Sequence, residues 1–150
     1  MRIIYHRPLK ECSRPRNYKP AHPEYDVQVS IFIWANLHKK RYPELELLNS
    51  SLNGVYLANP MRGVYAKKAG MKRGYPDLFL PVARGGYHGL FIELKAERRG
   101  AKITPEQKRW LANLTMQGYL AEVSYGLKPT LKLIENYLKG ECRVGANEDS

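Results

Sequence analysis

Two polar segments interrupt apolar stretches of the sequence where a buried strand would normally carry apolar side chains. The first is Pro76-Asp77, directly before the run LFLPV, and the second is Glu93-Leu94-Lys95, at the end of the run GLFIELK. Side chains alternate across a β-strand, so Glu93 and Lys95 are expected to share one face. The pattern predicts that carboxylates and an ammonium group meet on a buried sheet.

Such a group of residues has a specific use in chemistry. Converging carboxylates repel each other unless a positive charge lies between them, and a hard divalent cation such as Mg²⁺ or Mn²⁺ binds oxygen ligands while keeping some water. A metal-bound water can attack a phosphodiester, and the Lys95 ammonium can stabilise charge on the phosphate. Taken singly, Asp77 could be a turn residue, and Glu93 and Lys95 could form a surface ion pair of little energy.

A β-hairpin is predicted to bring the two polar segments together. Residues 77–82 and 88–95 have the apolar character of strands, and Arg84-Gly85-Gly86 is typical of the turn between them. With the turn centred near residues 85 and 86, residue 77 is expected roughly opposite residue 94.

The remaining elements predict an α/β fold, with a small mixed β-sheet flanked by helices. The helix that opens at Thr104-Pro105-Glu106-Gln107 has a capping-box sequence, with Thr104 as N-cap and Gln107 at the third helical position. Trp34 and Trp110 are expected in the core rather than as stacking platforms. Helices are predicted over 22–41, 61–74 (broken near Gly70), 104–118 and 129–138, and further strands over 52–58 and 119–125.

Composition excludes several classes of protein. The chain has 150 residues, of which 43% are hydrophobic, so it can form one domain with a core and is not disordered as a whole. No apolar run approaches the roughly 18 residues of a membrane span. Two distant cysteines, Cys12 and Cys142, indicate reduced thiols and hence a cytoplasmic protein, in a bacterial cytoplasm if phage or bacteria encode it. The expected organisation is a basic N-terminal arm (1–21), a domain (22–140) and a polar tail (141–150).

The positive charge is concentrated in the first half of the chain. The net charge is +11, with 14 basic and 5 acidic residues before residue 76 but 11 and 9 from there on. A basic surface of this strength indicates a polyanionic partner, most often nucleic acid, although it could also be a solvated surface.

The stretch from Gly74 to Gly126 resembles the VRR-NUC branch of the PD-(D/E)xK nucleases. The resemblance extends over most of residues 24–139, and its motifs are Pro76-Asp77, Glu93-Leu94-Lys95 and Thr104-Pro105-Glu106-Gln107 in combination. It implies a restriction-endonuclease-like fold and cleavage of DNA that depends on a divalent metal ion, Mg²⁺ or Mn²⁺.

The resemblance also implies roles for individual residues. Asp77 and Glu93 match metal-binding carboxylates, the backbone carbonyl of Leu94 matches a further ligand, and Lys95 matches the catalytic lysine. Gln107 matches a polar residue that reaches the site from the following helix, and this role and the capping box are both open to it.

A glutamate on the first helix helps to bind metal in this family, and Glu24 matches it. Glu24 shares a helical stripe with Gln28 and Ile31. The alternatives are that Glu24 only favours the helix dipole, or that Asp26 takes its place in the site.

Basic and polar residues around these motifs are candidates for contacts with the DNA backbone, which position DNA without reading its sequence. Asn59 and Arg62 resemble a polar loop of the family. A solvated basic face is the alternative for the whole set. The candidates are Asn59, Arg62, Lys67, Lys68, Lys72, Arg73, Arg98, Arg99 and Lys102.

Single-domain members of this kind occur in bacteriophage and bacterial genomes, and the resemblance implies a structure-selective endonuclease for branched DNA such as four-way (Holliday) junctions. A junction has two-fold symmetry, which a homodimer would match with two sites. The alternative is a DNA-binding or recruitment module without catalytic activity that retains the nuclease fold.

Overall fold

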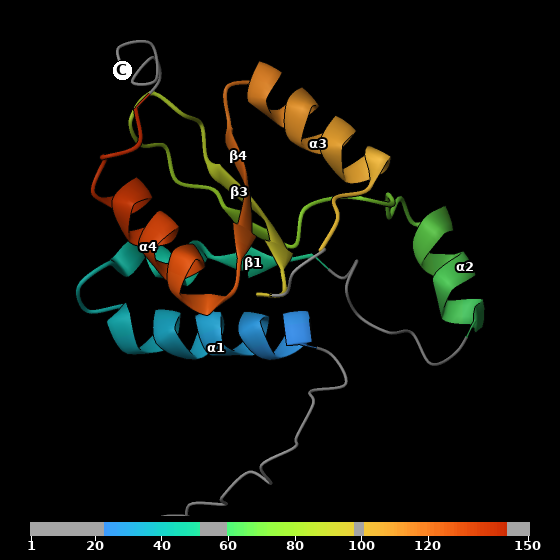
Figure 1. Cartoon of the computed structure of the whole chain (residues 1–150), viewed down its shortest axis with the longest axis horizontal. Coiled ribbons are helices and arrows are strands. Elements are labelled where there is room, and N and C mark those ends of the chain that lie inside the picture. Colours follow the sequence, from blue (N-terminus) through green and yellow to red (C-terminus); the bar gives the residue numbers. More distant parts are fainter. Residues whose placement is uncertain (1–22, 52–59, 98–100, 144–150) are drawn as a thin grey trace, which may run out of the picture.

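The protein is seen in a computed structural model, which describes residues 23–51, 60–97 and 101–143 and, within residues 60–63, the backbone alone (Figure 1). The expected arm (1–21), the strand expected over 52–58 and most of the expected tail lie outside these residues. None of the helices in the described ranges is long and apolar enough to cross a membrane.

The described residues form a four-stranded mixed sheet in the order β1-β2-β3-β4. β1 and β2 are antiparallel, as are β2 and β3, whereas β4 lies parallel to β3. A mixed sheet was predicted, and the structure confirms it. The strands are β1 (Asn49–Ser50), β2 (Leu78–Leu80), β3 (Leu90–Lys95) and β4 (Leu120–Tyr125).

Helices flank the sheet, and three of them differ clearly from their predicted bounds. α2 ends at Lys68 rather than at residue 74. α1 ends at His38, and Pro43 begins a separate 3₁₀ helix instead of ending α1. α4 begins at Leu127, two residues before the predicted start, because Gly126 at φ 76° turns the chain directly out of β4. The helices are α1 (Pro23–His38), η1 (Pro43–Leu47), α2 (Pro60–Lys68), α3 (Pro105–Met116) and α4 (Leu127–Leu138).

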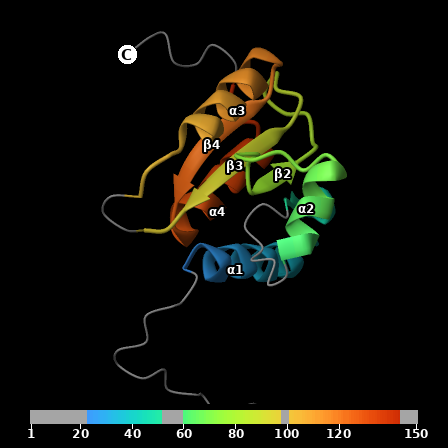
Figure 2. The same cartoon turned by 90° about the vertical axis from the view of Figure 1, so that its right-hand side faces the viewer.

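The sheet separates two helical layers. α1 and α4 pack beside each other on one face, and α3 covers the other, as the two views show (Figures 1 and 2). Ile31 of α1 and Ile134 of α4 are fully buried against Leu78, Ile92 and Leu94 of the sheet. Burial of this apolar face holds α1 and α4 onto the strands that carry the polar segments.

The opposite face of β3 begins with an aromatic cluster and ends with charged residues. The rings of Phe79 and Phe91 stack at 4.2 Å, and Tyr119 meets Phe91 edge to face. Glu93 and Lys95 follow Phe91 at alternate positions, and all six residues of β3 are buried. The strand therefore holds a carboxylate and an ammonium group inside the protein.

The hairpin between β2 and β3 forms as predicted, with Gly85 and Gly86 at positive φ between the paired residues Arg84 and Tyr87. The register differs from the prediction by one residue. Leu78 pairs with Ile92, which places residue 77 level with residue 93 rather than 94. Three residues (81–83) lie opposite two (88–89) between the turn and the strands, and this bulge accounts for the shift.

Candidate active site

Asp77 lies at the entrance to β2 and is bound to the neighbouring strand. Its Oδ2 atom accepts a hydrogen bond of 2.8 Å from the backbone nitrogen of Leu94. This bond continues the contact between β2 and β3 beyond their last paired residues, and it holds the carboxylate at the edge of β3.

Glu93 and Lys95 form a buried ion pair on the face of β3 that α3 covers. The Nζ atom of Lys95 donates to Oε1 of Glu93 at 2.9 Å. The two residues are 2% and 7% exposed. Burial of charge is costly unless the charge is paired, so this pair is a specific feature of the site and not the surface pair considered above.

Gln107 holds the carboxylate of Glu93 from α3. Its Nε2 atom donates to Oε1 of Glu93, while its own Oε1 accepts from the backbone nitrogen of Thr104 at 2.9 Å. Its backbone nitrogen donates to Oγ1 of Thr104 at 3.2 Å, which completes the capping box. Both roles considered for Gln107 are therefore present at once, because the amide has an oxygen for the cap and a nitrogen for the site.

The site has an excess of negative charge. Burial, together with the nearby Asp77 carboxylate, raises the pKa of Glu93 to about 7. Burial also raises the pKa of Asp77, against the hydrogen bond from Leu94. Burial alone would lower the pKa of Lys95, but the contact with Glu93 outweighs it and raises that pKa. Among the described residues, Asp77 and Glu93 thus share the ammonium group of Lys95, and a further positive charge would stabilise them.

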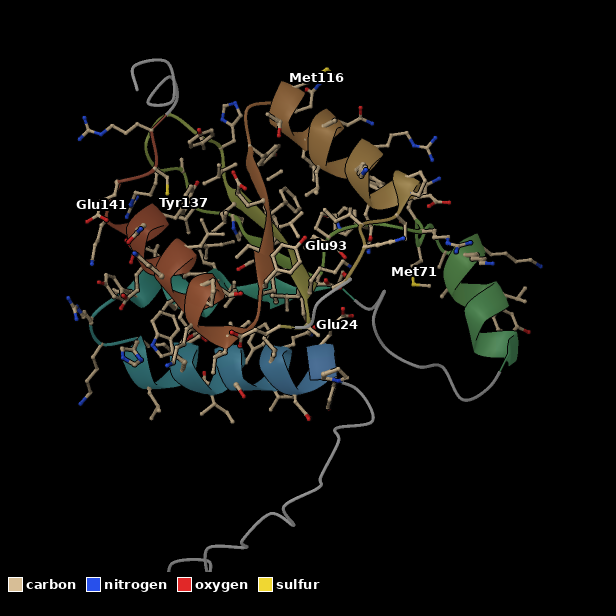
Figure 3. All side chains as sticks on the ribbon, viewed as in Figure 1. Glu24, Met71, Glu93, Met116, Tyr137 and Glu141 are labelled. Carbon is tan, nitrogen blue, oxygen red and sulfur yellow. The ribbon has the colours of Figure 1, made fainter. Side chains whose placement is uncertain are left out.

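Glu24 lies beside this group, at the first turn of α1 (Figure 3). Its Oε1 atom accepts a hydrogen bond from the backbone nitrogen of Ala96 at 3.4 Å, directly after β3. This contact favours Glu24 over Asp26 as the helix residue nearest the site. Within the described residues, however, no three Asp, Glu, His or Cys side chains are grouped closely enough to hold a metal ion.

The donors present fit a hard cation that keeps part of its water. Mg²⁺ binds to proteins through one or two carboxylates and retains several waters, and Asp77 and Glu93 supply two carboxylates. The Lys95 carbonyl accepts from Gly126 on the β4 side. Consecutive carbonyls of a strand point to opposite edges, so the Leu94 carbonyl points to the edge where Asp77 lies. These two carboxylates and one carbonyl can serve together as oxygen ligands.

The expected DNA contacts lie partly within the described residues. Lys67 and Lys68 are exposed at the last turn of α2, Lys72 and Arg73 are exposed on the loop after it, and Lys102 is exposed before α3. Arg62 belongs to α2, but its side chain lies outside the described part. Asn59, Arg98 and Arg99 also lie outside it.

Sequence reasoning missed residues of α3 that line a cavity next to this site. Both tryptophans are half-buried: Trp34 packs against the core as expected, whereas Trp110 lines this cavity of about 360 Å³. Arg109 and Asn113 line it as well. The spacing of 106, 109, 110 and 113 on one helical face was a usable signal. The facing wall comes from the loop after α2, which the sequence does not place.

The chain is similar to known proteins in sequence and in fold. Residues 18–127 match the model of the VRR-NUC domain family. A solved structure of a "VRR_NUC domain protein" is similar, with a TM-score of 0.65 and 31% sequence identity over 81% of this chain and 93% of that chain. No curated protein shows significant similarity to the chain. The structural likeness confirms the expected restriction-endonuclease-like α/β fold.

Proposed function

The chain belongs to the VRR-NUC domain family, and on that basis we propose that it is a deoxyribonuclease that hydrolyses phosphodiester bonds with Mg²⁺ or Mn²⁺ as cofactor. Membership implies nuclease-type activity of the PD-(D/E)xK superfamily on DNA, and these domains generally use divalent metal ions. The choice of metal and of DNA structure goes beyond what membership implies.

One observation carries the proposal: the Asp77 and Glu93 carboxylates lie at the same edge of β3, and Lys95, which donates to Glu93, is the ammonium group beside them among the described residues. Carboxylates repel an anionic substrate, so their place beside DNA makes sense when a cation binds them. A protein that only binds DNA gains nothing from a buried pair of carboxylates.

The residues of the chain have distinct parts in the proposed reaction. Asp77, Glu93 and the Leu94 carbonyl would hold the ion, which supplies charge stabilisation at the phosphate and a more acidic water. The Lys95 ammonium donates to Glu93 and can donate to a phosphate oxygen or orient the attacking water. Gln107 fixes the Glu93 oxygen that Lys95 also contacts.

Branched DNA and a homodimer belong to the same proposal. An apolar stripe on the exposed side of α1 supports self-association: Tyr25, Val29, Ile33 and Leu37 follow each other at four-residue spacing, and all four are exposed. A two-fold axis between Val29 and Ile33 would pair Tyr25 with Leu37 of the partner subunit, so the stripe is complementary to itself.

Charge supports the same pairing of the two α1 helices. The first turn of α1 carries the exposed Asp26, and the exposed Lys40 and Arg41 follow its last turn. In an antiparallel pair, the acidic end of one helix meets the basic end of the other. A dimer of this kind would present two active sites to a two-fold symmetric junction.

Cleavage of a synthetic four-way junction beside a linear duplex of the same sequence tests the proposal. With Mg²⁺ or Mn²⁺, the protein is expected to cut the junction faster than the duplex. Equal rates would contradict structure selectivity. Salt-sensitive binding of both substrates without any cutting would instead support the DNA-binding or recruitment module.

A further inference from the structure

The loop after α2 is held against α3 where the two segments line the cavity. Trp110 Nε1 donates to the carbonyl of Arg73 at 3.1 Å, and the rings of Tyr75 and Trp110 meet edge to face at 5.0 Å. Gly74 has φ +78°, and a Cβ there would lie 2.8 Å from the Cβ of Glu106 and 2.9 Å from the nitrogen of Gln107. Only glycine fits this approach without strain, so the loop lies tightly against the first turn of α3.

The residues that line the cavity combine three kinds of chemistry. Basic side chains can bind phosphate, an indole ring can stack on a base, and a carboxylate and an amide can bind the polar edge of a base. Contacts with the backbone of a duplex require the basic residues alone. The lining residues are Lys72, Arg73 and Arg109, then Trp110, then Glu106 and Asn113.

The cavity and the candidate active site are built on the same two segments, the start of α3 and the loop before β2. Glu106, in its wall, precedes Gln107, whose amide holds Glu93. On the facing loop, Gly74 contacts the backbone of Gln107 and lies three residues before Asp77. A ligand in the cavity would therefore lie beside the residues proposed to act on the phosphodiester. Its volume of about 360 Å³ is in the range of pockets that hold small molecules.

We propose that this cavity binds an unpaired nucleotide of the DNA substrate. The base stacks on Trp110, its polar edge meets Glu106 and Asn113, and its phosphate lies against the basic side chains. This inference rests on the proposed function for the identity of the polymer. It adds a residue set on α3 that would hold the strand next to the scissile bond, and it would account for the preference for branched DNA proposed above.

Fluorescence of Trp110 tests the proposal directly. The chain has two tryptophans, so a Trp34→Phe variant leaves Trp110 as the sole reporter. A short single-stranded oligothymidylate, titrated in EDTA, is expected to quench its emission to saturation, because a stacked base contacts the indole. An unchanged emission would overturn the proposal, as would equal quenching by a blunt duplex.

Substitutions within the cavity provide a second measurement, made by anisotropy of a labelled oligothymidylate, which needs no change at Trp34. Arg109→Ala and Asn113→Ala each remove a proposed hydrogen bond to the nucleotide and are expected to weaken binding about tenfold. Lys108→Ala, an exposed cation on the same helix outside the cavity, serves as the matched control and should bind as the wild type does. If Arg109→Ala behaved like Lys108→Ala, the cavity would not be the binding site.

The two proposals fail separately in these experiments. Binding is measured without metal and can be repeated in Asp77→Asn, so it does not depend on cleavage. Saturable quenching by a protein that never cuts DNA with Mg²⁺ or Mn²⁺ would support the nucleotide cavity while contradicting the proposed nuclease. Cleavage of DNA without any quenching of Trp110 would support the proposed nuclease and contradict the nucleotide cavity.

Discussion

The side-chain amide of Gln107 on α3 donates a hydrogen bond to the carboxylate of Glu93 on β3, while its oxygen accepts from the backbone of Thr104. One residue thus caps a helix and positions a buried carboxylate. The orientation of the amide is fixed by the cap, so the helix start and the active site are coupled through a single side chain.

Replacement of Gln107 separates these two roles when it is compared with replacement of Thr104. Gln107→Ala and Thr104→Ala both break the capping box, and each is expected to lower the free energy of unfolding by about 1 kcal/mol. Gln107→Ala also frees Glu93, so its cleavage rate is expected to fall about 10–100-fold, whereas Thr104→Ala stays near the wild-type rate. Denaturant unfolding and single-turnover cleavage measure the two effects. Equal loss of activity in both variants would contradict a positioning role for Gln107.

The stability of the metal-free protein is expected to fall as pH rises toward neutrality. The folded pKa of Glu93 is raised from 4.5 to about 7, by burial and then by Asp77. The folded state therefore binds this proton more tightly than the unfolded state does, which stabilises the fold. The stabilisation is complete below the unfolded pKa of Glu93 and is lost as pH rises through about 7. Melting temperatures in EDTA between pH 4.5 and 8 should show this fall.

Glu93→Gln should remove most of that pH dependence, because its amide does not titrate. The exposed Glu46→Gln provides the control and should keep the wild-type profile. Parallel profiles for Glu93→Gln and the wild type would show that Glu93 is not the group responsible.

Divalent cations are expected to stabilise the folded protein at pH 7.5. A divalent ion held by Asp77 and Glu93 would supply positive charge to these two carboxylates. At a concentration of 100 times its Kd, it would raise the free energy of unfolding by about 2.7 kcal/mol. Asp77→Asn should abolish the stabilisation. Calorimetric titration with Mn²⁺ measures the binding itself, and unaltered Mn²⁺ affinity in Asp77→Asn would exclude Asp77 as a ligand.

The exposed apolar stripe of α1 predicts a homodimer, and a charged side chain introduced into the stripe is expected to disrupt it. Ile33→Glu places a carboxylate at the centre of the proposed contact, so light scattering should change from dimer to monomer. Leu47→Glu, an exposed apolar residue on η1 outside the stripe, should remain dimeric. A wild-type monomer at all concentrations measured would contradict the homodimer.

Local patterns in the sequence were enough to predict that Asp77, Glu93 and Lys95 lie close together. Strand periodicity placed Glu93 and Lys95 on one face, and the glycine turn folded Asp77 back toward them. The capping box predicted the start of α3. These features depend on residues close together in the chain, and the structure has each of them.

The differences arise where separate segments meet. The one-residue shift in register comes from the bulge at residues 81–83, where Val82 N donates to the Leu80 carbonyl. Pro81, which has no backbone N–H and is typical of bulges, lies there and was a usable signal, although it does not by itself give the register. The reach of Gln107 to Glu93 depends on the angle of α3 over the sheet. The cavity depends on the close approach of Gly74 to α3. The sequence alone does not show that these two segments are neighbours.

The central claim is that Asp77, Glu93 and Lys95 cut DNA with a divalent metal ion, and the rate of junction cleavage by Lys95→Ala tests it most directly. We expect cleavage by the wild type with Mg²⁺ or Mn²⁺ and none in EDTA, and a loss of roughly 10²–10³-fold in Lys95→Ala. The exposed Lys132→Ala is the control, and circular dichroism shows that each variant is folded. Cleavage by folded Lys95→Ala at the wild-type rate, or undiminished cleavage in EDTA, would contradict the claim.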